Sequence, residues 1–189
     1  MTVVVIAMSA VTALNAGAQT TINTTTKTTD RSGVILSAGP EAGIPLGSLG
    51  DRYGWNFGSS VQAAIPVWSN QLYFTTSAGV SNLLFKNSYT ANQNDLLLLP
   101  VRAGLKYYAV GSLYIQGEAG ASFLLNKDQG GYDKTTTFAY SPSIGYQFML
   151  AKGQYLDASV KFEGNTKFTT NGPANNFIGL RLAYSFGLK

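Results

Sequence analysis

The sequence predicts an all-β fold, an eight-stranded antiparallel up-and-down transmembrane β-barrel, and three observations predict it. From Val34 onward, apolar residues alternate with small or polar ones, which is the period of a strand whose two faces meet different surroundings. Most of the segments with this period exceed ten residues, whereas soluble strands average about five or six and a membrane-crossing strand needs about 9–11. The connections alternate between short and long, as transmembrane barrels require at their two ends.

Each strand is assigned from the run of alternation between two turn signals. The predicted strands are residues 34–44, 54–67, 71–83, 97–110, 112–125, 136–150, 154–164 and 176–189. Three connections are tight hairpins, at Trp68-Ser69-Asn70, at Gly111 and at Ala151-Lys152-Gly153. The four others, at 45–53, 84–96, 126–135 and 165–175, are longer and polar. Short periplasmic turns and four longer outer loops follow from this pattern.

The N-terminus predicts export through the Sec pathway. An apolar run over residues 3–14 is followed by Ala16-Gly17-Ala18, a small-x-small cleavage pattern, so residues 1–18 are predicted to be a signal peptide. The run lacks a preceding Lys or Arg, and the alternative is a buried strand or helix of the domain. Residues 19–33 are Thr-rich and are expected to form a flexible leader. The barrel domain is then residues 34–189.

The composition of the chain excludes several classes of function. Only 12% of the residues are charged, against about 25% in typical soluble domains. The net charge of +4 comes from scattered residues with no basic cluster, so no nucleic-acid partner is expected. The chain has no Cys and no His, which excludes Ser-His-Asp catalysis, thiolate chemistry and the commonest metal ligand. We therefore expect no enzyme, no catalytic residue, no metal site and no cofactor.

The two faces of the predicted strands differ in kind. One face is apolar, with aromatic residues near the strand ends that suggest a girdle at each membrane interface; these are Trp55, Phe57, Tyr107, Tyr146 and Phe148. The other face is small or polar and carries four charges of each sign: Glu41, Arg102, Lys106, Glu118, Asp157, Lys161, Glu163 and Arg181. Enclosed in a narrow barrel, such charges must pair. The sequence therefore predicts a lumen charge network.

A soluble lipocalin-like barrel or β-sandwich would show the same alternation with inside and outside exchanged. Its outer face would then consist mostly of Gly, Ser and Gln, its strands would be unusually long, and its edges would lack the protection typical of soluble sheets. These features favour the membrane interpretation.

The chain resembles the small outer-membrane β-barrel proteins of Gram-negative bacteria, the porin-family or opacity-like group, and especially the versions common in the Bacteroidetes. The resemblance covers residues 34–189. It depends on SAGPEAGIPLG in the first strand, on AGLKYY and LYIQGEAGASF in the middle hairpin, and on IGLRLAYSFGLK at the end. It implies a place in the outer membrane of the cell envelope. It also implies a C-terminal signal, with Tyr184 and Phe186, for the barrel-assembly machinery. The usual terminal aromatic is here followed by Gly187, Leu188 and Lys189.

Together these observations predict a non-enzymatic integral outer-membrane protein. It would be a monomeric scaffold in outer-membrane lipid that displays its loops to an unidentified ligand, around a lumen filled by side chains. The alternative is a narrow porin-like channel or small-solute transporter.

Overall fold

The computed structural model describes residues 33–47, 50–51, 53–85, 96–126, 135–166 and 175–188. The predicted signal peptide lies outside these residues, as does the Thr-rich leader except for Gly33. The described chain forms strands with short turns between them. The strands are β1 (Val34–Leu46), β2 (Tyr53–Trp68), β3 (Leu72–Phe85), β4 (Leu96–Val110), β5 (Leu113–Leu124), β6 (Thr136–Ala151), β7 (Gln154–Asn165) and β8 (Asn175–Leu188).

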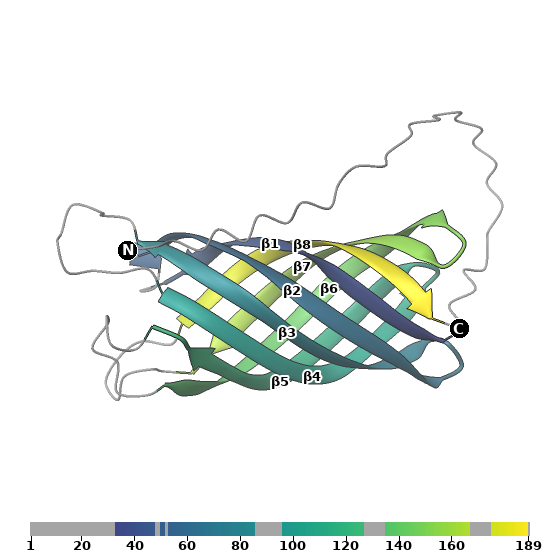
Figure 1. The fold of residues 1–189 in the computed structure, drawn as a ribbon, viewed down its shortest axis with the longest axis horizontal. Helices are drawn as coiled ribbons and strands as arrows, with labels where there is room; N and C mark the ends of the chain where they lie inside the picture. Colours follow the sequence, from purple (N-terminus) through teal and green to yellow (C-terminus); the bar gives the residue numbers. More distant parts are fainter. Residues whose placement is uncertain are drawn as a thin grey trace, which may run out of the picture.

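Each strand pairs antiparallel with its sequence neighbours, and β8 pairs with β1 to close the barrel. The closing seam aligns Val34 with Leu188 and Leu46 with Asn176, so it runs along the whole of β1 (Figure 1). Closure leaves no unpaired sheet edge, which is the condition for placing a sheet in hydrocarbon. The prediction of an eight-stranded up-and-down barrel is confirmed, with strand ends within two residues of those expected.

The short turns lie together at one end of the barrel, where β1 begins and β8 ends (Figure 1). Ser69 and Asn70 both have positive φ, at 47° and 53°, as do Gly111 at 56° and Gly153 at 75°. Left-handed backbone at these positions matches the twist of the flanking strands and allows a tight hairpin. We call this the turn end. The longer connections leave from the opposite, loop end.

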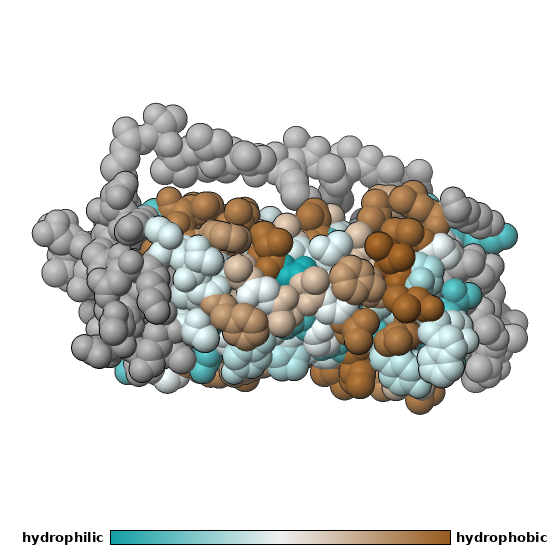
Figure 2. All heavy atoms as spheres, turned by 90° about the horizontal axis from the view of Figure 1, so that it is seen from below, coloured by the Kyte–Doolittle hydropathy of each residue, from teal (hydrophilic) through white to brown (hydrophobic). Residues whose placement is uncertain are grey.

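Alternation places apolar side chains on the outside of every strand. Among the most exposed are Val61, Leu180 and Ile44, at 58%, 63% and 54%. Figure 2 shows one face of the barrel, on which apolar residues extend along the wall and strongly hydrophilic ones are few. An exposed apolar surface of this extent on a closed barrel is that of a lipid-facing wall. Among the described residues, no helix has the length and hydropathy to cross a membrane.

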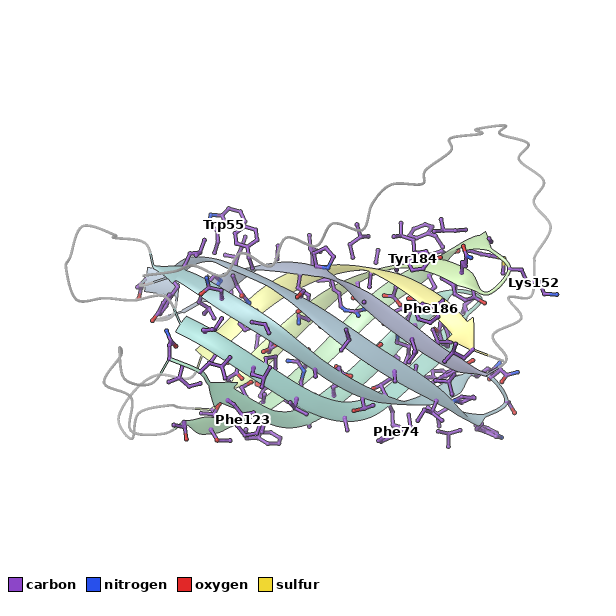
Figure 3. All side chains as sticks on the ribbon, in the orientation of Figure 1. Trp55, Phe74, Phe123, Lys152, Tyr184 and Phe186 are labelled. Atoms are coloured by element: carbon purple, nitrogen blue, oxygen red, sulfur yellow. The ribbon has the colours of Figure 1, made fainter. Side chains whose placement is uncertain are left out.

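Outward aromatic residues gather near both ends of the wall. Figure 3 shows Trp55 and Phe123 toward the loop end and Phe74, Tyr184 and Phe186 toward the turn end. On β6, the outward residues Phe138 and Phe148 are ten positions apart. At a rise of about 3.3 Å and a tilt of about 40°, they are separated by about 25 Å along the barrel axis, the height of a transmembrane apolar band.

Close approach of strands in the narrow interior depends on glycine. Gly104 of β4 points inward opposite Glu118 of β5. A Cβ at Gly104 would overlap the carbonyl oxygen of Gly117, whereas a Cβ at Gly117, on the outer face, would meet nothing within 4 Å. The missing side chain at Gly104 therefore lets the backbones of β4 and β5 approach closely.

The orientation of the wall predicts a depth-dependent cost for an outward charge. Val101 lies at mid-height on β4, and Val110 lies on the same strand at the turn end. Val101→Arg should lower the free energy of unfolding in lipid vesicles by about 2–4 kcal/mol, and Val110→Arg by at most about 1 kcal/mol, because a charge is costly only in the hydrocarbon centre. Urea titration of both variants measures the difference. Equal costs would contradict a lipid-facing Val101.

Candidate functional site

The interior of the barrel is the candidate site, because it gathers all eight charged side chains of the described strands. Inward positions of β1, β4, β5, β7 and β8 supply them. Glu41 is slightly more exposed than the other seven. The seven buried residues are Arg102, Lys106, Glu118, Asp157, Lys161, Glu163 and Arg181. All eight charged residues assigned to the lumen from sequence point into it, and each takes part in an ion pair.

Six of these charges form one chain in which the signs alternate. It begins at Glu118, whose Oε2 lies 3.9 Å from Arg102 Nε. Arg102 continues to Glu163 through its Nη1 atom. Glu163 Oε2 then lies 3.3 Å from Lys161 Nζ. One carboxylate of β7 thus links cations of β4 and β7 across the interior.

The chain continues from Lys161 to Glu41 of β1, whose other oxygen lies 3.4 Å from Arg181 Nε. Two serines complete this part. Ser60 donates a hydrogen bond to Glu41 Oε1 at 2.6 Å, and Arg181 donates to Ser60 Oγ at 2.8 Å and to Ser37 Oγ at 3.1 Å. Buried charges are stable only when paired and hydrogen-bonded in this way.

A second cluster, centred on Asp157, lies nearer the turn end. Asp157 is fully buried, and both of its carboxylate oxygens are used. Tyr114 Oη donates to Oδ1 at 2.6 Å, and Gln147 Nε2 donates to Oδ2 at 3.0 Å. Lys106 Nζ lies 3.4 Å from Oδ2 and 4.1 Å from the centre of the Tyr114 ring. Tyr108 Oη in turn donates to Gln147 Oε1 at 2.7 Å.

The turn end of the lumen is closed by aromatic residues. Tyr73, Tyr108 and Tyr114 pack edge to face, with ring centroids 5.5 and 5.6 Å apart. Ile35 and Ala64 complete this buried cluster. We call these five residues the turn-end cap.

The loop end of the lumen has an apolar layer of its own. Its buried members are Tyr53, Leu83, Leu98, Leu124 and Phe177. Beneath them, Ser122 donates to Asn165 Oδ1 at 2.8 Å and Ser81 donates to Asn56 Oδ1 at 2.6 Å. The interior is therefore layered, with charged and polar side chains between two apolar ends.

Between these layers remains a polar cavity of about 20 Å³, lined in part by Glu41, Ser77, Arg102, Glu118 and Arg181. Such a volume holds about one water molecule. No group of three or more metal-ligating residues occurs in the described strands and turns.

Sequence reasoning missed the large inward residues. Tyr73, Tyr155 and Phe177 were not assigned to the lumen, although their exposures are 0%, 1% and 2%. Aromatic residues at strand ends were expected on the outside. The available signal was their parity: Tyr73 lies two positions from Thr75 and four from Ser77, both inward.

The aromatic residues predicted for the girdle all point outward. Trp55 and Phe57 lie near the loop end and stack with their ring centroids 6.1 Å apart. Tyr146 and Phe148 lie near the turn end, with their ring centroids 4.7 Å apart. Tyr107 is also exposed at the turn end. Tyr184 and Phe186 point outward from β8, on the last residues before the chain end. Their role in assembly stays a prediction.

Comparison with known proteins bears on the fold. The structure of Neisserial surface protein A superimposes with a TM-score of 0.60 at 18% identity, covering 83% of this chain and 98% of the other. The fold is that of the small outer-membrane β-barrels. The structure of outer membrane protein AlkL in lipid bilayers superimposes with a TM-score of 0.53 at 17% identity, covering 90% of this chain and 97% of the other. Ail, the attachment invasion locus protein of Yersinia pestis, superimposes with a TM-score of 0.52 at 17% identity, covering 81% of this chain and 97% of the other. No protein-family model and no curated protein sequence matches the chain.

Glu163 joins two cations, so its removal should be costly. Glu163→Ala should lower the free energy of unfolding by about 3 kcal/mol or more, because it leaves Arg102 and Lys161 short of negative charge in the interior. Lys152→Ala, in the exposed turn between β6 and β7 (Figure 3), should change the free energy of unfolding by less than about 0.5 kcal/mol. Urea unfolding in vesicles compares the two. An equal, small effect would show that the six-residue chain adds nothing to stability.

Proposed function

We propose that this protein is a non-enzymatic integral outer-membrane β-barrel that serves as a scaffold, with a lumen closed by side chains and four longer connections displayed at one end. The observation that carries the proposal is the occupied interior. Paired charges and two apolar layers leave a polar cavity of about 20 Å³ among the described residues. A lumen filled in this way supports a structural role for the interior, and the loop end is then the proposed surface for contact with other molecules.

We propose that the barrel is inserted in the outer membrane. A closed β-barrel with an apolar band of about 25 Å and two aromatic girdles fits such a bilayer. The expected signal peptide and Sec export are consistent with this destination in a Gram-negative cell. Two proteins with the same fold are named a surface protein and an attachment invasion locus protein, which agrees with a role for the displayed end.

The remaining assignments follow from the same features. The absence of His and Cys from the whole sequence argues against the usual hydrolytic chemistry. The proposed partners are outer-membrane lipid along the wall and the barrel-assembly machinery at Tyr184 and Phe186. We propose a monomer with no nucleic-acid partner.

The alternative is a narrow channel or small-solute transporter. It would require a continuous path through the interior. The turn-end cap, the chain of six charges, the Asp157 cluster and the loop-end apolar layer all lie across such a path. The structure therefore supports the scaffold over the channel.

Conductance in planar bilayers separates the two functions. The refolded protein should give no resolved single-channel steps in 1 M KCl, because the interior offers ions no continuous aqueous route. A general porin inserted in the same bilayer is the positive control. Reproducible steps from this protein would replace the scaffold proposal with the channel.

A further inference from the structure

We infer that Asp157 is the positioning residue of a seal that separates the central cavity from water at the turn end. The inference rests on the closed lumen of the proposed function and assigns that closure to particular residues. The seal is the turn-end cap together with Gln147. Asp157 and Lys106 form the buried charge pair that holds it.

The geometry places Asp157 beneath the cap. It is the fourth residue of β7, so it lies close to the turn end. Tyr114, which donates to it, belongs both to the cap and to the lining of the central cavity. The Tyr114 ring and hydroxyl therefore stand between the cavity and the turn end.

A single acceptor fixes several donors at once. Asp157 binds Tyr114 and Gln147 directly, and Gln147 holds the hydroxyl of Tyr108. Tyr108 packs edge to face against both Tyr73 and Tyr114. Replacing the carboxylate by an amide leaves one acceptor oxygen, so Tyr114 keeps its acceptor while the Gln147 and Lys106 donors at the second oxygen lose theirs. Buried donors without an acceptor are costly and are satisfied by water.

The Asp157 cluster is separate from the longer ion-pair chain. In the described strands, Lys106 and Asp157 pair with each other, whereas Glu118, Arg102 and Glu163 pair along the six-residue chain. Glu118 bonds to Gln62 and Arg102, and neither belongs to the turn-end cap. Glu118 is thus a matched control: a buried carboxylate with a cationic partner that does not hold the tyrosines.

A cysteine reporter reads the seal directly, since the chain has no native cysteine. Ser77 lines the central cavity, and its buried hydroxyl makes no hydrogen bond, so Ser77→Cys breaks none. The full chain is refolded into lipid vesicles, and a membrane-impermeant methanethiosulfonate reagent is applied to one side at a time. Lys152→Cys, at the exposed turn, identifies the side on which the turn end lies.

In the S77C background, labelling should be slow from both sides. Asp157→Asn should speed it at least about tenfold from the turn side only, because the amide presents donors to Lys106 and Gln147 and the cap loosens. Glu118→Gln should leave the turn-side rate unchanged. The double variant K106M/D157N should label more slowly than D157N, because it removes the unpaired Lys106 charge and the amide oxygen at position 157 still accepts from Tyr114.

Two failures are distinguishable. If S77C alone labels as fast as K152C, the lumen is open and the proposed scaffold is wrong. If S77C is slow and D157N leaves it slow, or speeds it equally from both sides, the seal does not depend on Asp157. Folding is verified by an SDS-resistant band before each measurement. Should D157N lack that band, Lys106→Met takes its place, with the same turn-side increase expected and an unchanged rate overturning the inference.

Discussion

A wall one residue thick is the constraint on which this structure depends. Successive side chains of a strand point to opposite faces, and in a closed barrel one face meets lipid while the other meets the interior. Each pair of neighbouring residues must therefore satisfy two incompatible surroundings. Val101 and Arg102 illustrate it: the first is 42% exposed on the wall and the second is 5% exposed in the lumen.

The charge network is a consequence of that constraint. An eight-stranded barrel has little interior volume, so charged side chains placed inside cannot keep their water and must find one another. The six-residue chain and the Asp157 cluster fulfil this with four positive and four negative residues. The narrow interior also brings neighbouring strands close together, and a Cβ at Gly104 would overlap the backbone of Gly117.

Strand number, strand order and the identity of the two faces were predictable from sequence, because they depend on the local period of two. The partners inside the lumen were not. Lys161 and Glu41 are 120 positions apart, and they meet only because closure and stagger bring β1 and β7 to the same level.

The apolar layers were also missed, since aromatic residues near the strand ends were expected on the lipid side. Tyr73 and Phe177 point inward because their positions in β3 and β8 have inward parity. Parity decides orientation here, and hydrophobicity does not. These inward aromatic residues support the proposed closed lumen, because they cover its two ends, which charged side chains alone would leave open to water.

The central claim is that the apolar face meets lipid, and the two tryptophans test it in the unmodified protein. Trp55 and Trp68 are 53% and 67% exposed on the outside, toward the loop end and the turn end. In vesicles of brominated phosphatidylcholine, both should be quenched, more strongly by bromines near the headgroup than by bromines near the chain terminus, because they lie at the rims of the apolar band. Fluorescence that no brominated lipid changes would contradict the claim and would indicate that the apolar face does not contact lipid.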